Sequence, residues 1–199
     1  MAKVYPRAHL SSPSSSSSKI QILTIWMKSL VLNGNGCTIY GSDGQIVYRV
    51  DNYAWRCSNE VYLMDHSGRT LTKILRKKPR VFGQWQGYRC DGLIAEKHEP
   101  WFRLQKSWIL KRDQNFEAKV TFRDGSNNVS CYKILGSASK TEYKIIDIEG
   151  KPVAEVKRKL TSSGVVLGED VLTLIVEPNH DQLLVMGLVI VCGLINHRM

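Results

Sequence analysis

The densest basic group in the sequence consists of Arg76, Lys77, Lys78 and Arg80. It lies in the segment 69–112, whose 12 Lys or Arg and 3 acidic residues give it +9 of the chain's net charge of +10. Ammonium and guanidinium groups that gather at a loop bind phosphate and the head groups of anionic lipids. The group is therefore a candidate site for anionic membrane lipid. The alternative is a solvated face whose long side chains cover apolar surface with their stems.

Aromatic residues are interleaved with further basic residues just downstream. The aromatic members are Trp101, Phe102 and Trp108, and the basic members are Arg103, Lys106, Lys111 and Arg112. Such mixtures can bind single-stranded nucleic acid by stacking bases on the rings. In a β-strand, however, alternate side chains point to opposite faces, so adjacent rings would be divided between them. The pattern favours packing at a core and its rim, and nucleic acid is the less favoured partner.

Residues for catalysis or metal binding follow no recognised pattern. The five histidines and five cysteines lack the spacing of metal ligands, and the sequence has no glycine-rich phosphate loop and no Gly-x-Ser-x-Gly motif. Acidic pairs such as Asp124 and Glu149 fall at expected turns, where carboxylates bond to the backbone. We therefore predict a protein that is not an enzyme and has no catalytic residue, cofactor or metal.

The composition is that of a single intracellular domain. At 199 residues, with 43% hydrophobic and 23% charged residues, the chain suffices for one hydrophobic core. Its five scattered cysteines favour a reducing compartment, and no stretch near the N-terminus has the length of a signal-peptide core. We predict a monomer in the cytoplasm or held peripherally at the plasma membrane, with a nuclear pool as a further option.

The first 19 residues differ in composition from the rest. They contain three basic residues and no acidic residue, and serine fills most positions from 11 to 18. Such sequence cannot bury enough apolar surface to offset the entropy of ordering. We expect a disordered tail at 1–19 and a single folded domain at 20–199. A plastid transit peptide is the less favoured interpretation of the tail.

Alternating apolar and polar residues dominate the sequence from residue 37 onward. Short turn signals separate the alternating runs, which is typical of antiparallel β structure. The expected hairpins pair 37–40 with 45–50, 60–65 with 70–76, 116–122 with 129–135, and 143–148 with 153–159. A last strand is expected at 171–176. So many strands would leave long unpaired edges in an open sheet, which favours a closed barrel.

The glycines of the expected turns are regularly spaced. Gly44 and Gly68 lie 24 residues apart, Gly125 and Gly150 lie 25 apart, and the two pairs are offset by 81 and 82 residues. This pattern indicates an internal duplication, with halves at about 37–110 and 115–199. Coincidence is the alternative, because any series of hairpins places glycine where a turn needs a positive φ.

The segment 183–195 is apolar all round, with no side chain more polar than that of Cys192. A helix of this kind must be enclosed on every side. We expect a helix at about 180–196, with Asn179 as its N-cap and Gln182 completing a capping box. Its apolar part spans about 20 Å, short of the roughly 30 Å of hydrocarbon in a bilayer, so it fits the inside of a barrel better. A C-terminal membrane anchor is the alternative.

Four motifs follow one another in the chain. They are LTKILRKK at 71–78, WQGYR at 85–89, VAEV at 153–156 followed by three basic residues, and VEPN at 176–179 followed by Asp181. Together they resemble the plant LURP-one-related proteins over residues 32–198. The resemblance implies a tubby-like fold, in which a closed antiparallel β-barrel of about twelve strands surrounds a buried hydrophobic C-terminal helix.

The resemblance also implies kinship with the phospholipid scramblases and the tubby proteins. It further implies a plant protein of poorly defined biochemistry, some relatives of which are tied to basal defence against pathogens. Tubby proteins bind phosphoinositides at the plasma membrane and have been proposed as membrane-tethered transcription regulators. The proline-rich, cysteine-cluster N-terminal region of scramblases has no counterpart before Lys19, which argues against scrambling activity. The first hypothesis is accordingly a peripheral binder of anionic phospholipid or phosphoinositide. The alternative is a regulatory protein that acts through protein or DNA contacts.

Overall fold

The computed structural model describes residues 17–29, 35–52, 59–78, 83–90, 99–106, 116–123, 128–136 and 141–195. Twelve β-strands and one α-helix lie within these ranges. They are β1 (Gln21–Trp26), β2 (Asn35–Tyr40), β3 (Ile46–Asn52), β4 (Glu60–Asp65), β5 (Thr70–Arg76), β6 (Gln84–Arg89), β7 (Phe102–Lys106), β8 (Phe116–Arg123), β9 (Val129–Gly136), β10 (Tyr143–Asp147), β11 (Pro152–Arg158), β12 (Val171–Val176) and α1 (Gln182–Ile195).

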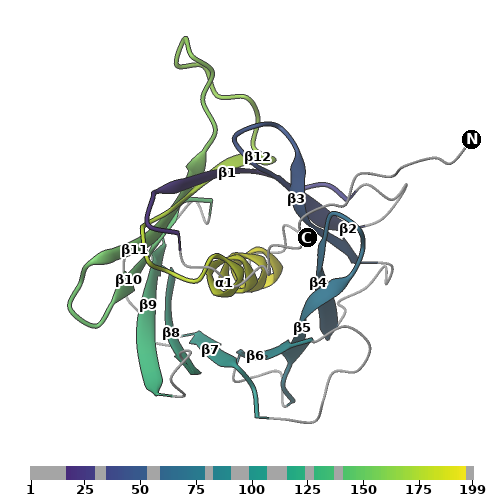
Figure 1. The fold of residues 1–199 in the computed structure, drawn as a ribbon. Helices are drawn as coiled ribbons and strands as arrows, with labels where there is room; N and C mark the ends of the chain where they lie inside the picture. Colours follow the sequence, from purple (N-terminus) through teal and green to yellow (C-terminus); the bar gives the residue numbers. More distant parts are fainter. Residues whose placement is uncertain are drawn as a thin grey trace, which may run out of the picture.

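The strands form one closed antiparallel barrel in which neighbours along the chain are neighbours in the sheet (Figure 1). The first and last strands close it, with Gln21 opposite Val176 and Trp26 opposite Val171. Closure removes the sheet edges that an open arrangement would expose. The closed β-barrel expected from the sequence, with its twelve strands, is thereby confirmed.

The strands expected from alternation lie close to where they were predicted. Each of the nine begins and ends within two residues of its expected bounds, and 60–65, 70–76 and 171–176 match without any shift. Strands β1, β6 and β7 were not among those predicted. The tail at 1–16 and the loop that holds Gly125 lie outside the described residues.

Three of the spaced glycines occupy the same kind of turn. Gly44, Gly68 and Gly150 have φ angles of 78°, 90° and 84°. In each turn the glycine N–H donates to the carbonyl three residues earlier, as from Gly68 to Asp65 at 3.1 Å. Only glycine adopts this backbone conformation without steric cost. The turns alone account for these glycines, and the duplicated halves at 37–110 and 115–199 stay a prediction.

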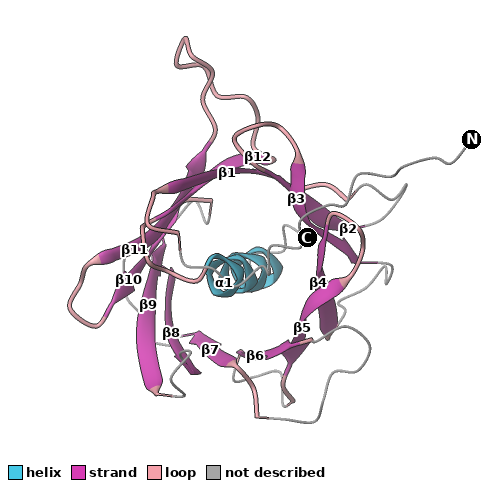
Figure 2. Ribbon diagram, viewed as in Figure 1, coloured by secondary structure: helices cyan, strands magenta, loops and turns pink. Residues whose placement is uncertain are grey.

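The helix α1 lies along the inside of the barrel (Figure 2). Every side chain from Leu183 to Cys192, as well as the backbone at Gly187 and Gly193, is buried. The inward residues of the strands and this helix form one hydrophobic cluster. Burial on all sides explains why the segment carries no polar stripe. Among the described residues, no helix is both long and apolar enough to cross a membrane.

Helix α1 packs closely against Phe102 of β7 in the barrel wall. A methyl group on Gly87 of β6 would lie 2.0 Å from the ring atom Cε1 of Phe102, and one on Gly187 of α1 would lie 2.9 Å from the same atom. Phe102 itself is fully buried. The ring therefore fills the space that two missing side chains leave, one on the strand and one on the helix.

The start of the helix differs from the prediction. Asp181, and not Asn179, is the N-cap, because its carboxylate Oδ1 accepts the N–H groups of Leu183 at 2.9 Å and Leu184 at 3.1 Å. Asn179 lies in a turn with φ of 65° and so cannot begin the helix. The guanidinium of Arg89 donates to the second carboxylate oxygen of Asp181 at 2.6 Å, which ties the helix start to β6.

The helix also distinguishes the two ends of the barrel. It begins beside the end of β12 and the start of β1, which we call the near end, and it runs toward the far end. Its first residue, Gln182, accepts a hydrogen bond from Tyr48 near the start of β3. Because neighbouring strands are antiparallel, every odd-numbered strand ends at the far end. The connections after β5 and after β11 therefore both lie there.

Candidate anion-binding face

The structure separates the members of the predicted basic group. Arg76 follows the fully buried Ile74 by two residues, so it shares the inner face of β5. Its guanidinium lies 5.7 Å from the ring centre of Trp85, and its Nε is buried without a hydrogen-bond partner. Lys77 and Lys78 are exposed beyond the strand end, and Arg80 lies outside the described residues. Arg76 thus faces the barrel interior while the two lysines face solvent.

Lys77 is the first member of a row of exposed side chains that continues across β6, β7, β8 and β9. Its backbone N–H donates to the carbonyl of Gln84 at 3.0 Å, which continues the pairing of β5 with β6. Gln84 lies opposite Gln105, Gln105 opposite Lys119, and Lys119 opposite Lys133. Side chains in register across a sheet point to the same side. Three lysines and two amides therefore line up on the outer surface, from Lys77 at the far end to Lys119 and Lys133 in the middle of β8 and β9.

A second row runs parallel to the first, one step closer to the near end. Arg103 of β7 lies between Gln86 of β6 and Thr121 of β8 in register. Thr121 in turn lies opposite Cys131 of β9. Arg103 is exposed, and its neighbours on either side can donate hydrogen bonds. The guanidinium is thus the centre of a polar patch that adjoins the lysine row.

These cations differ from others nearby in having no acidic partner. We call Lys77, Lys78, Arg103, Lys119 and Lys133 the cationic face. Among the residues that the structure describes, none of the five has an ion pair or a side-chain hydrogen bond. By contrast, Lys73 on β5 is held by Glu60 at 2.8 Å, and Arg123 on β8 is paired with Glu99. The charge of the face is therefore available to a ligand.

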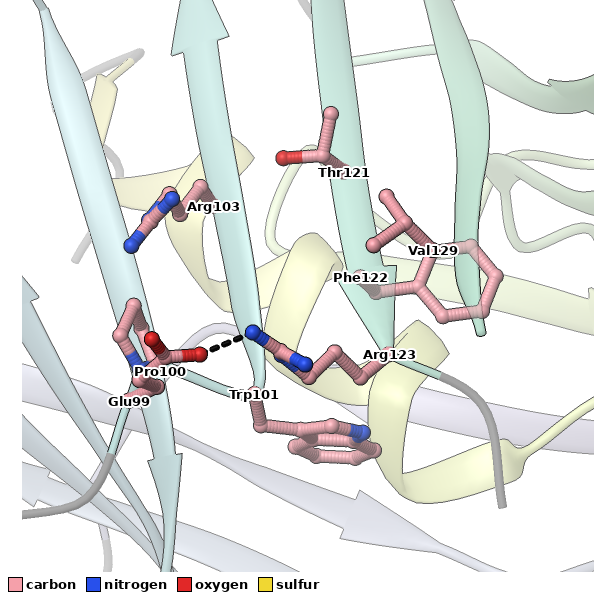
Figure 3. Close-up of a pocket in the computed structure, with 8 residues that line it drawn as sticks. All are labelled: Glu99, Pro100, Trp101, Arg103, Thr121, Phe122, Arg123 and Val129. Atoms are coloured by element: carbon pink, nitrogen blue, oxygen red, sulfur yellow. Dashed lines mark hydrogen bonds and ion pairs between the residues drawn. The ribbon is translucent and has the colours of Figure 1, made fainter. Parts of the chain in front are cut away.

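Two hollows adjoin each other on the face, and Arg103 and Thr121 line both. The first is lined otherwise by Gln84, Trp85, Gln86, Leu104, Gln105 and Lys119, with no acidic residue among them. The second holds Glu99, which Arg123 neutralises (Figure 3). Positive charge and amide donors without a competing carboxylate suit a phosphate or carboxylate group. The first hollow is the part of the face best built for an anion.

Of the four cysteines within the described residues, Cys37 and Cys192 are buried in the barrel, and Cys90 and Cys131 are partly exposed. Burial raises the pKa of the Cys37 thiol to about 12, and it raises the pKa of Cys192 as well. A reactive thiol needs a lowered pKa and access to solvent, which is the opposite environment. Within the described residues, no three His, Cys, Asp or Glu side chains gather in a way that could hold a metal ion.

The sequence model of the LURP-one-related family matches residues 21–193. The chain belongs to the LURP-one-related family. It is 46% identical to Protein LURP-one-related 4 of Arabidopsis thaliana, over 98% of this chain and 87% of that protein. It is also 46% identical to Protein LURP-one-related 3 of the same plant, over 84% of this chain and 76% of that protein. The family that the four motifs indicated is confirmed.

A solved structure shares the fold. The X-ray structure of an Arabidopsis thaliana protein matches this LURP-one-related chain with a TM-score of 0.64 and 16% sequence identity. The match covers 92% of this chain and 96% of that one. At this identity the likeness shows a common fold, and it confirms the barrel architecture.

Proposed function

We propose that this LURP-one-related protein is not an enzyme and binds anionic phospholipid peripherally, at the surface of a membrane. The observation that carries the proposal is the cationic face, because its five positive side chains have no acidic partners among the described residues. A basic side chain held near an anionic membrane surface contributes about 1 kcal/mol of attraction. Several such side chains on one rigid sheet suffice for reversible binding that weakens with salt.

The orientation of the aromatic residues favours lipid over nucleic acid. Single-stranded nucleic acid stacks its bases on exposed rings. Trp85 is 3% exposed and Phe102 is fully buried, so both rings point into the barrel and away from the cationic face. Trp101 is partly buried beneath the guanidinium of Arg89, 4.0 Å from its ring centre. Trp108 lies outside the described residues, and the hydroxyl of the partly exposed Tyr88, on the outer side of β6, donates to Gln86 at 2.8 Å. The described part of the face thus offers mainly charge and hydrogen bonds.

A phosphorylated inositol head group is the ligand class that best fits the first hollow. Arg103 and Lys119 supply positive charge there, and the amides of Gln86 and Gln105 supply neutral donors. Multiple phosphates would engage more of these groups than a single phosphodiester does. We also propose that the protein is related to the tubby proteins and the scramblases. Its setting would be plant defence or membrane-tethered regulation.

Charge reversal at the far end tests the proposal. The double variant Lys77→Glu with Lys78→Glu is expected to weaken co-sedimentation with vesicles of phosphatidylcholine and phosphatidylserine by about tenfold or more, because four charge units change at the contact. The matched control is Lys19→Glu with Lys151→Glu, which changes the net charge equally but at exposed positions of the near end. The control is expected to bind within about twofold of the unaltered protein.

Two outcomes would count against lipid binding by the cationic face. If the unaltered protein fails to sediment with anionic vesicles, the proposed function is wrong. If both double variants lose binding equally, net charge and not the face governs the attraction. Vesicles that carry phosphatidylinositol bisphosphate at matched total charge show whether phosphorylated inositol is preferred over phosphatidylserine.

A further inference from the structure

The connection between β11 and β12 projects from the barrel as a long hairpin (Figure 1). Four of its apolar side chains face solvent. They are Leu160 at 53% exposure, Val165 at 61%, Val166 at 44% and Leu167 at 50%. Large apolar side chains exposed together on a projecting element mark an interaction site, whereas single ones do not. The barrel core does not use these four side chains.

Backbone and side-chain hydrogen bonds hold the tip of this hairpin in a defined conformation. Leu160 forms a β-bridge with Val166. The N–H of Thr161 donates to the carbonyl of Val165 at 2.8 Å, and the hydroxyl of Thr161 accepts the N–H of Val165 at 3.0 Å. Gly164 closes the turn with φ of 81°. Hydrogen bonds on both arms fix the direction of the side chains, so their exposure is a stable property of the fold.

Charge around the hairpin is positive where it leaves the barrel. Lys157, Arg158 and Lys159 precede the apolar tip, and no acidic residue occurs from 157 to 168. Lys157 lies 3.7 Å from Glu155, and the ammonium of Lys159 donates to the hydroxyl of Thr24. The returning arm carries two acidic residues, Glu169 and Asp170. Asp170 is held within the protein by Lys28 at 3.3 Å and by the indole N–H of Trp26 at 3.2 Å. An apolar tip backed by basic residues matches the profile of an anionic bilayer, which has hydrocarbon beneath a negative surface.

The hairpin and the lysines after β5 belong to the same end of the barrel. Both follow odd-numbered strands, so both lie at the far end. A membrane that covers the far end can therefore meet Lys77, Lys78 and the base of the hairpin, while the hairpin itself projects from the β12 side of the barrel, opposite β6 and β7 (Figure 1). The two elements come from opposite halves of the sheet, in strands β5 and β6 and in strands β11 and β12, which gives two separated points of contact.

A second copy of the chain is a less suitable partner for the hairpin tip than a bilayer is. Four half-exposed aliphatic side chains on a narrow ribbon offer a few hundred Å² per copy, whereas a stable interface buries roughly 1,200 Å² or more in total. A bilayer needs no complementary surface. Entry of a few aliphatic side chains to the level of the acyl chains is enough to add hydrophobic energy to an electrostatic contact.

We propose that residues 160–167 form a membrane-inserting tip, which places Leu160, Val165, Val166 and Leu167 in the outer hydrocarbon of an anionic bilayer. This inference rests on the proposed function, because insertion follows electrostatic attraction to the same membrane. The tip adds a contact that salt does not screen. Binding through the tip and binding through the cationic face are therefore separable.

A polar tip tests the inference. The variant Leu160→Gln, Val165→Thr, Val166→Thr, Leu167→Gln keeps side-chain size and the β-branched positions but removes the apolar surface. It is expected to leave thermal stability unchanged, to bind phosphatidylserine vesicles about tenfold more weakly, and to lose the rise in surface pressure that the unaltered protein causes in a phosphatidylserine monolayer. The control Ile20→Thr with Ile148→Thr removes exposed apolar side chains, at 55% and 76% exposure, from the near end and is expected to insert normally.

The outcomes separate the inference from the proposal beneath it. If the unaltered protein binds anionic vesicles and the polar-tip variant raises the surface pressure equally, insertion by the tip is wrong while lipid binding stands. If the unaltered protein binds no anionic vesicle, both are wrong. If the polar-tip variant changes the sedimentation coefficient of the free protein, the tip is an interface between copies, and that result also overturns insertion.

Discussion

Replacement of Leu188 by Asp is expected to abolish soluble folding. Leu188 is fully buried in the middle of α1, inside the closed barrel. Truncation of a buried leucine to alanine alone costs about 3–5 kcal/mol, and a buried carboxylate without a partner adds several more. The whole free energy of unfolding of a domain is only about 5–15 kcal/mol. The fraction of protein in the soluble phase, together with circular dichroism of whatever remains soluble, measures the effect.

The same substitution at an exposed leucine provides the control. Leu160→Asp places the charge on a side chain that is 53% exposed, so this variant is expected to fold and melt like the unaltered protein. Deletion of residues 180–199 is expected to leave the barrel without its filling and therefore insoluble. A C-terminal membrane anchor requires the reverse, a soluble and folded domain after deletion. That result, or a soluble folded Leu188→Asp variant, would contradict a helix buried in the barrel.

Gly87→Ala is expected to destabilise the protein by more than about 3 kcal/mol, which corresponds to a fall in melting temperature of roughly 10 °C for a chain of this size. The new methyl group would meet the ring of Phe102 at 2.0 Å. The ring has little room to move, because its Cε1 atom would also lie 2.9 Å from a methyl group on Gly187 of the helix. Thermal melting followed by circular dichroism measures the shift.

A second substitution shows whether the ring is the cause. Phe102→Leu shortens the side chain and removes the clash, so Gly87→Ala is expected to cost much less in that background than in the unaltered protein. Gly44→Ala is the control for backbone effects, since no atom lies within 4 Å of its added methyl group and only its φ of 78° is strained. Additive effects of Gly87→Ala and Phe102→Leu would show that the two residues do not share one space.

Local patterns in the sequence were enough to predict most of the barrel. The hairpins at 60–76 and 143–159 combine alternation with a turn that requires glycine, so their strands could be placed within a residue or two. The apolar segment at 183–195 could be assigned to the interior because its length and its lack of a polar stripe leave few other places for it. Both inferences depend on local chemistry alone.

Two of the three missed strands, β1 and β6, owe their structure to distant contacts. Strand β6 contains a single buried large apolar side chain, Trp85, and a glycine that weakens any strand prediction. The reason for that glycine, the ring of Phe102 in the next strand, cannot be seen locally. Strand β1 carries Ile22 on its outer face at 54% exposure, so its apolar residues do not alternate. Its place in the sheet is set by pairing with β12, which is 145 or more residues away along the chain.

The candidate site was only partly predictable for the same reason. The sequence drew attention to Arg76, Lys77 and Lys78 because they are adjacent, yet alternation turns Arg76 inward at the strand end. Lys119 and Lys133 were missed, although the register of the predicted hairpin 116–135 already places them side by side. Their alignment with Lys77 requires the order of five strands, which only the closed barrel supplies.

The most direct test of the central proposal is lysine acetylation of the unaltered protein, followed by mass spectrometry, with and without phosphatidylserine vesicles. The cationic face predicts that vesicles protect Lys77, Lys119 and Lys133, while Lys19 and Lys151 at the near end react at the same rate as in free protein. Equal protection of all five lysines, or protection confined to Lys19 and Lys151, would contradict a membrane contact at the cationic face.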